Sequence, residues 1–160
     1  VHQAGNAIMF QIAHAGRQTT KKMAGAVPIG PSGKGRDPLN FVKPREMEKK
    51  DIQDVIQAFS EAARRAMEAG ADGIQIHAAH GYIVNQFLSP FFNERSDEWG
   101  GNDKNRFRFL KEIFLKIKKS TDNRLPVIVK LNTNDYTPKQ GITLDLSVKY
   151  SGWLAELGVD

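Results

Sequence analysis

Cysteine is absent from this sequence of 160 residues. Disulfide bonds, zinc–thiolate centres and iron–sulfur clusters ligated by cysteine are therefore excluded within the chain. No apolar run approaches the roughly 18 residues that a helix needs to cross a bilayer. Residues 1–10 also lack the charged start and apolar block of a secretion signal. These absences fit a cytoplasmic protein that has no membrane partner.

Positive charge is not concentrated in any part of the sequence, although the formal net charge is +5. The densest clusters, residues 49–50 and 116–119, are short and stand at the ends of predicted helices, and at a helix C-terminus such cations complement the helix dipole. A nucleic-acid partner is therefore not expected. No G-x-G-x-x-G segment follows a predicted strand, so a separate dinucleotide-binding fold is not expected either.

The sequence does contain three short apolar runs that alternate with three segments of helical periodicity. Runs of about six residues suit buried strands, whereas apolar residues spaced by three and four positions mark one face of a helix. Gly70 is expected to cap the first helix at its C-terminus, and Asn102 and Thr143 are expected to cap the next two at their N-termini. The predicted strands are residues 7–12, 72–77 and 126–131, and the predicted helices are residues 49–67, 103–120 and a segment after Thr143.

Two long segments, residues 13–45 and 78–103, show neither period, and each follows a predicted strand. Connections of this length without regular structure usually carry function. The continuous apolar run at residues 126–131 is typical of parallel strands that are covered on both faces. Alternating strands and helices predict a parallel α/β sheet, whose ligands bind at the loops after the strands. The pattern fits a (β/α)-barrel or a doubly wound sheet and does not separate the two.

The last residues of the chain resemble an earlier junction between a helix and a strand. Residues 69–73 lead into a predicted strand, and residues 157–160 have a similar sequence. The chain therefore stops where a fourth strand is expected. Because three parallel strands cannot close a barrel, we expect residues 1–160 to form a single incomplete domain.

The strongest chemical pattern is His77-Ala-Ala-His80-Gly-Tyr82, at the end of a predicted strand and the start of its loop. Two imidazoles can donate hydrogen bonds to one carbonyl oxygen, and a tyrosine hydroxyl can donate a proton in the same step. Two other interpretations stay open from these residues alone. The histidines could be satisfied by the backbone at a strand end, or they could be a metal-binding pair that takes a carboxylate from elsewhere.

Several segments, in order along the chain, resemble the pattern of a known family. They are QIAHAGRQ at 11–18, HAAHGY at 77–82, QFLSP at 86–90, NERSD at 93–97, GG at 100–101, NRFRF at 105–109, VKLN at 129–132 and DY at 135–136. Together they closely resemble the Old Yellow Enzyme family, also described as the NADH:flavin oxidoreductase / NADH oxidase family. The subgroup resembled most is the bacterial one with two histidines in the substrate pair. The resemblance spans nearly the whole chain.

The resemblance implies a partial (β/α)8 TIM barrel that binds FMN, with this chain supplying about strand–helix units three to five. It implies that Gln11 hydrogen-bonds the polar edge of the flavin and that Lys130 places its charge near the flavin N1 and O2. His77 and His80 would bind and polarise the substrate carbonyl. Tyr82 would protonate the α-carbon while hydride reaches the β-carbon. No metal is implied.

Four basic residues lie within the segments that resemble the family. Lys130 stands where the family most often has arginine, so the charge is kept and the bidentate fork is lost. Arg17, Arg95 and Arg106 belong to the family pattern. We expect these three arginines to hold loops through carboxylate pairs rather than to contact the cofactor.

We therefore expect an FMN-dependent ene-reductase that uses NADH or NADPH to reduce activated C=C bonds of α,β-unsaturated carbonyl compounds. Its partner would be a small enone-type substrate, and the full-length protein could form a homo-oligomer. One alternative is a barrel hydrolase that binds a metal through the HxxH pair. Others are a truncated flavin-binding remnant without catalysis, and a relative that reduces dienoyl-CoA or dehydrogenates amines.

Overall fold

The computed structural model describes residues 1–37 and 40–160, and three parallel strands form its central sheet. The strands lie in the order β1 (Met9–Ile12), β4 (Gly73–Ala78) and β5 (Val127–Leu131). The predicted strands are thus confirmed to within one or two residues at each end. Within this sheet, the order of the strands in space is the same as their order along the chain.

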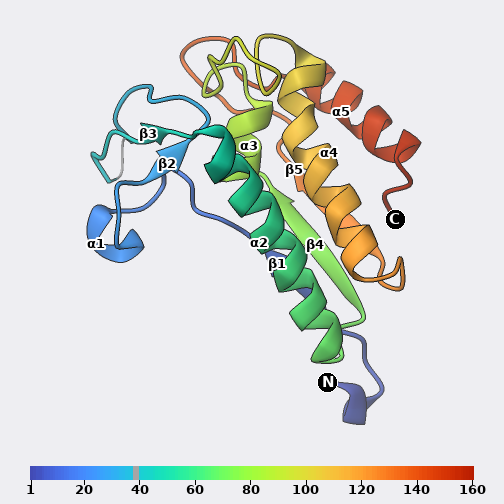
Figure 1. The fold of residues 1–160 in the computed structure, drawn as a ribbon. Helices are drawn as coiled ribbons and strands as arrows, with labels where there is room; N and C mark the ends of the chain where they lie inside the picture. Colours follow the sequence, from blue (N-terminus) through green and yellow to red (C-terminus); the bar gives the residue numbers. More distant parts are fainter. Residues whose placement is uncertain (38–39) are drawn as a thin grey trace.

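Three long helices connect or follow these strands. They are α2 (Lys49–Glu68) between β1 and β4, α4 (Asp103–Ser120) between β4 and β5, and α5 (Leu144–Glu156) after β5. In Figure 1, α2 and α4 lie side by side across one face of the sheet. Helices on one face of strands in consecutive order give the winding of a barrel, whereas a doubly wound sheet places helices on both faces. The sheet is open, so the structure is a partial barrel.

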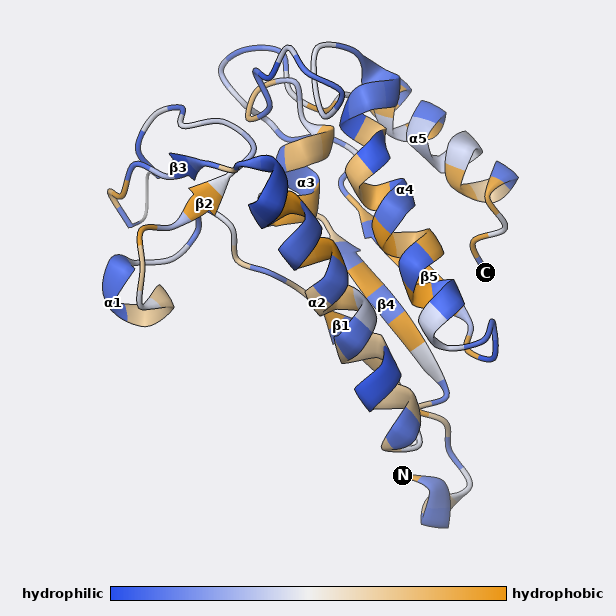
Figure 2. Cartoon of the chain, viewed as in Figure 1, coloured by the Kyte–Doolittle hydropathy of each residue, from blue (hydrophilic) through white to orange (hydrophobic). Residues whose placement is uncertain are grey.

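The core lies between this sheet and its helices. Figure 2 shows the outward face of α2 as mostly hydrophilic, with hydrophobic bands of β4 behind it. Burying an aliphatic or aromatic side chain of this size contributes roughly 1.5–3 kcal/mol. The core side chains that are at most 2% exposed include Ile52, Ile56 and Phe59 of α2, Ile74 and Ile76 of β4, Leu110, Ile113 and Phe114 of α4, and Val127 of β5.

The predicted helix ends are confirmed by cap geometry. The Asn102 side chain accepts a hydrogen bond from the Asn105 N–H at 3.0 Å at the start of α4. The Thr143 hydroxyl accepts from the Leu146 N–H at 3.3 Å at the start of α5. Gly70, just after α2, has a φ of 86°, which a residue with a side chain rarely adopts.

Residues 13–45 contain short regular elements that were not expected. They are a single-turn helix α1 (Lys21–Ala24) and a pair of two-residue parallel strands, β2 (Ile29–Gly30) and β3 (Arg45–Glu46). Elements this short span about one period of a hydrophobic pattern, so the pattern does not repeat and the sequence carries no signal for them. Residues 38–39 of this segment lie outside the described residues.

Residues 78–103 contain a further unexpected helix, α3 (Ile83–Leu88). All six of its residues are buried. A helix that is buried all round has no polar face, and its sequence therefore shows no amphipathic period.

The coverage on both faces that the apolar run at residues 126–131 predicts is not found for β5 in this chain. β1 is mostly exposed and β5 is mostly half-buried. β1 lies at the edge of the sheet with β4 as its one neighbour, and α2 and α4 cover one face. The other face carries the exposed side chains of Gln11 and Lys130.

The two similar junctions recognised in the sequence make the same contacts in space. The Asp72 carboxylate accepts a hydrogen bond from the Ile8 N–H at 2.6 Å, and the Asp72 N–H donates to the Ile8 carbonyl at 2.9 Å. Asp160 does the same to Val127, with distances of 2.8 and 3.3 Å. Each aspartate therefore follows a helix and clamps the start of the strand that precedes that helix.

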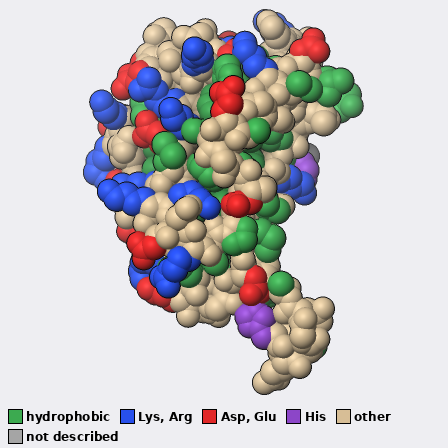
Figure 3. All heavy atoms as spheres, turned by 90° about the vertical axis from the view of Figure 1, so that its right-hand side faces the viewer, with side chains coloured by type: hydrophobic (Ala, Val, Ile, Leu, Met, Phe, Trp, Pro, Cys, Tyr) green, Lys and Arg blue, Asp and Glu red, His purple; other side chains and the backbone are tan. Residues whose placement is uncertain are grey.

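The described surface mixes charges of both signs. On the face in Figure 3, Lys and Arg side chains lie among Asp and Glu side chains rather than in one stripe. Lys149, for example, lies 2.8 Å from a carboxylate oxygen of Asp103. Within residues 1–37 and 40–160, no helix combines the length and apolar character that crossing a membrane requires.

Candidate active site

The predicted site residues lie on one face and one edge of the sheet. Strand register places Gln11 beside Gln75 and His77 beside Lys130. Side chains alternate between faces along a strand, so Gln75 and His77 of β4 point to the same side, together with their partners. This is the face that α2 and α4 leave open, and His77 and Lys130 lie near the carboxyl ends of their strands.

His77, His80 and Tyr82 form one aromatic cluster at that edge. The ring centroids of His77 and His80 are 4.9 Å apart with the planes at 84°. The rings of His77 and Tyr82 are also 4.9 Å apart, at 83°. Tyr82 stands at the N-cap position of α3, so the short helix that follows fixes where its side chain begins. The structure thus brings together the three residues for which the sequence predicts a common role.

The environment of His77 defines its protonation state. Burial lowers the pKa of His77, and the nearby charges of His80 and Lys130 lower it further. The ring is therefore neutral at pH 7. Its Nδ1 accepts a hydrogen bond from the Ala79 N–H at 3.3 Å, so the proton of the neutral ring is on Nε2. His77 is left with one N–H donor that can serve a ligand.

Side-chain amides hold the turn that carries His80. His80 has a φ of 60°, a strained value for a residue with a side chain, and Gly81 follows with a φ of 74°. The His80 N–H donates to Asn132 Oδ1 at 3.0 Å, and its carbonyl accepts from Gln18 Nε2 at 2.8 Å. The Gly81 N–H donates to Asn85 Oδ1 at 2.7 Å. These three hydrogen bonds, together with the glycine at position 81, stabilise a backbone conformation that would otherwise be unfavourable.

The sequence did not point to this set of amides. Their partners lie up to 62 residues away, as for Gln18 and His80, so no local spacing reveals them. One signal was present, because the apolar segment around α3 contains the adjacent amides Asn85 and Gln86, and both are fully buried. Buried amides need hydrogen-bond partners and therefore mark a polar network.

Gln11 and Lys130 present polar groups on the open face of the sheet. The Gln11 amide donates to Gln75 Oε1, which fixes its orientation and leaves its own oxygen free to accept. Both Gln11 and Lys130 are exposed. Gln75 is a further residue that the sequence did not point to as part of the site.

The surroundings of the histidine pair bear on the metal-site alternative. Among the residues that it describes, no group of three His, Cys, Asp or Glu side chains could hold a metal ion. The carboxylate that a metal site at His77 and His80 would require is therefore not found in this part of the chain.

The three signature arginines have protein partners. Arg95 Nη2 lies 2.6 Å from Asp97, and its Nη1 donates to two backbone carbonyls at 2.8 Å. Arg106 lies 2.6 Å from Asp103, and Arg17 lies 3.9 Å from Asp37. The contacts of Arg95 and Arg17 agree with the expectation that the arginines hold loops, whereas the pair of Arg106 and Asp103 lies within α4.

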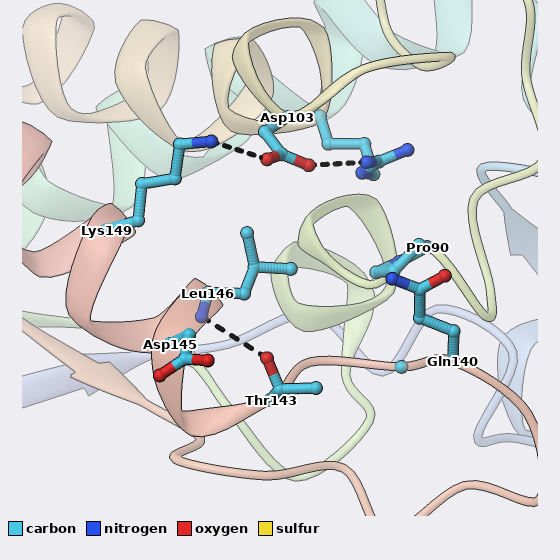
Figure 4. Close-up of a pocket in the computed structure, with 9 residues that line it drawn as sticks. Pro90, Asp103, Gln140, Thr143, Asp145, Leu146 and Lys149 are labelled. Atoms are coloured by element: carbon cyan, nitrogen blue, oxygen red, sulfur yellow. Dashed lines mark hydrogen bonds and ion pairs between the residues drawn. The ribbon is translucent and has the colours of Figure 1, made fainter.

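Three charged residues that line a pocket of about 240 Å³ between α4 and α5 also pair with one another. Figure 4 shows Asp103 beside the ammonium group of Lys149, and the guanidinium group of Arg106 donates to the same carboxylate at 2.6 Å. Thr143 caps α5 on the opposite side of the pocket. The polar groups of this pocket join two helices and lie apart from the histidine cluster.

The sheet has parallel strands in chain order, with helices on one face. This arrangement defines the chain as part of a (β/α)8 barrel. Its candidate active site lies at the carboxyl ends of the strands, where barrels of this kind carry their active sites. The model of the NADH:flavin oxidoreductase / NADH oxidase family matches residues 1–160. The chain belongs to this family.

Individual relatives agree with this assignment. An NADPH dehydrogenase of Geobacillus sp. (strain WCH70) is 44% identical over 164 residues, which cover the whole chain and 45% of that relative. The structure of an old yellow enzyme homologue from Zymomonas mobilis has a TM-score of 0.88 and 29% identity, over 99% of this chain and 47% of that one. A 2-naphthoyl-CoA reductase complex has a TM-score of 0.91 and 30% identity, over 99% of this chain and 26% of that one. The chain thus spans less than half the length of these relatives.

Proposed function

We propose that this chain carries the substrate-activating part of an FMN-dependent reductase that uses NADH or NADPH to reduce the C=C bond of α,β-unsaturated carbonyl compounds. The observation that carries the proposal is the cluster of His77, His80 and Tyr82, with rings 4.9 Å apart, at the carboxyl edge of the barrel sheet. Family membership and relatives named NADPH dehydrogenase and 2-naphthoyl-CoA reductase support the same chemistry.

The residues on the open face fit a flavin. The edge of a flavin ring offers hydrogen-bond donors and acceptors, and the oriented amide of Gln11 can both donate and accept. The exposed ammonium group of Lys130 suits the end of the ring that gains negative charge on reduction. Bound FMN would supply the hydride that it receives from the nicotinamide nucleotide.

The chain's own residues then act on the substrate. The Nε2–H of neutral His77 donates a hydrogen bond to the substrate carbonyl oxygen, and the ring of His80 provides the second donor. Both interactions strengthen as negative charge develops on that oxygen, so they stabilise the transition state more than the bound substrate. The Tyr82 hydroxyl donates a proton to the α-carbon.

Separate measurement of the two half-reactions tests this proposal. The full-length flavoprotein that contains the chain should lose its visible flavin absorbance when NADPH or NADH is added without oxygen, and regain it when cyclohex-2-enone is added. Tyr82→Phe should slow the second step by about 10²-fold or more and leave the first nearly unchanged, because general acid catalysis contributes about that much. A variant in which both steps fall together would show that Tyr82 is not the proton donor.

Tyr150→Phe is the matched control, since Tyr150 lies on α5 and its hydroxyl donates to the Leu88 carbonyl at 2.9 Å, outside the histidine cluster. It should leave both steps unchanged. A protein that stays colourless with added FMN would contradict the flavin proposal and favour a remnant without catalysis.

A further inference from the structure

We infer that Asp135 is a positioning residue that sets the place of His80 through two asparagines; the inference deepens the proposed function and rests on it for the role of His80. Asp135 lies in the loop after β5, and among the described hydrogen bonds none joins it to the three clustered rings. Its Oδ1 accepts hydrogen bonds from Asn85 Nδ2 at 3.1 Å and from Asn132 Nδ2 at 2.9 Å. It therefore binds two of the three amides that hold the His80–Gly81 turn, those that accept its N–H groups.

The carboxylate decides which way the two amides face. An ionised carboxylate can only accept hydrogen bonds, so the NH₂ groups of Asn85 and Asn132 must point toward Asp135. Their oxygens then point the other way, where they accept the N–H groups of Gly81 at 2.7 Å and His80 at 3.0 Å. One carboxylate thus orients two consecutive peptide groups at the point where the backbone turns left-handed.

The loop after β5 in turn holds Asp135. Its Oδ2 accepts the Ile142 N–H at 3.0 Å, and its own N–H donates to the Ile142 carbonyl at 3.0 Å. Gly141 permits this approach, because a Cβ on that residue would lie 3.0 Å from the Asp135 Cβ. The loop after β5 is thereby tied to the loop after β4, and the position of His80 depends on both.

An amide at position 135 cannot reproduce this pattern. If the oxygen of an introduced asparagine accepts from Asn85 and Asn132, its NH₂ group faces the Ile142 N–H, and two donors meet. If the amide is turned round, its NH₂ group faces those of Asn85 and Asn132. Those two could avoid the clash by turning, but their NH₂ groups would then face the N–H groups of His80 and Gly81. Asp135→Asn therefore keeps the size of the side chain. It removes the arrangement in which Asn85 and Asn132 can accept the N–H groups of Gly81 and His80.

A thermodynamic cycle in the full-length flavoprotein separates positioning from general stability. The affinity for cyclohex-2-enone is measured by calorimetry on the oxidised protein without nucleotide, for wild type, Asp135→Asn, His80→Ala and the double variant. Asp135→Asn should weaken binding about tenfold when His80 is present and less than twofold when it is absent. An equal loss in both backgrounds, or no loss in either, would overturn the inference.

Hydrogen exchange gives a second readout that does not depend on turnover. Asp135→Asn should accelerate exchange in the peptide that contains residues 79–86, whereas the control Asp145→Asn, an exposed aspartate that follows the same strand, should not. Unchanged exchange in Asp135→Asn would refute the inference. If Asp135→Asn does not fold, Asn132→Ala removes one of the two amides and enters the same cycle, with about a threefold loss expected only when His80 is present.

The two proposals fail in different ways. A wild-type protein that does not reduce the enone contradicts the proposed function. The exchange rates of residues 79–86 then still decide whether Asp135 holds the His80 turn.

Discussion

Replacing Arg95 by leucine should lower the free energy of unfolding by about 3.5 kcal/mol. The Arg95 side chain is 9% exposed, and its Nη1 donates at 2.8 Å to the carbonyls of two buried residues, Pro31 and Met47. Leucine leaves both carbonyls without this charged donor, at about 1.5 kcal/mol each. The Asp97 carboxylate is 37% exposed, so water can replace most of its lost ion pair, which adds only about 0.5 kcal/mol. Urea unfolding followed by circular dichroism measures the change.

Arg124→Leu is the matched control for this substitution. Arg124 also stands two positions from an aspartate, but its side chain is 64% exposed and lies 3.7 Å from Asp122. Its loss should change the free energy of unfolding by less than about 0.5 kcal/mol. If the two variants differ by less than about 1 kcal/mol, Arg95 does not anchor the loops as its contacts indicate.

Two further predictions concern buried titratable side chains. Tyr150→Phe removes the hydroxyl that donates to the Leu88 carbonyl at 2.9 Å and should cost about 1 kcal/mol in the same urea assay; an unchanged value would contradict this. Burial lowers the pKa of His14, and burial with nearby positive charges lowers that of His77, from the ordinary value of 6.5. The unfolded chain therefore takes up protons first as the pH falls, so stability present above about pH 6.5 is lost below it. His14→Gln should make the urea midpoint less sensitive between pH 7.5 and 5.5, and an unaltered pH dependence would count against this.

The main elements of the fold could be predicted because they have clear local signals. α2 and α4 are long enough to repeat their apolar period several times, and Asn102 and Thr143 cap their helices through contacts three residues away. The winding of the sheet could not be derived from the pattern, since barrels and doubly wound sheets share the same alternation. α3 could not be found either, because all six of its residues are buried and no polar face marks it.

The candidate site was predictable in part for the same reason. His77, His80 and Tyr82 lie within six residues of one another, so a strand end was enough to bring them together. The contacts that shape the site are long-range, as between His80 and Asn132, which are 52 residues apart. Such contacts depend on how two loops meet after the sheet has formed, and no spacing within either loop encodes them.

The clamps made by Asp72 and Asp160 hold strands at the amino end of the sheet, whereas the candidate active site lies at its carboxyl end. At the amino end, the same joint holds β1 and β5, with one carboxylate contact and one backbone contact each. At the carboxyl end, each loop carries residues of its own, such as His80 and Tyr82 after β4. Substitutions in the loops that carry the chemistry therefore leave these joints untouched, because the two sets of contacts lie at opposite ends of the strands. The reactive edge can in this way change while the joints that hold β1 and β5 stay the same.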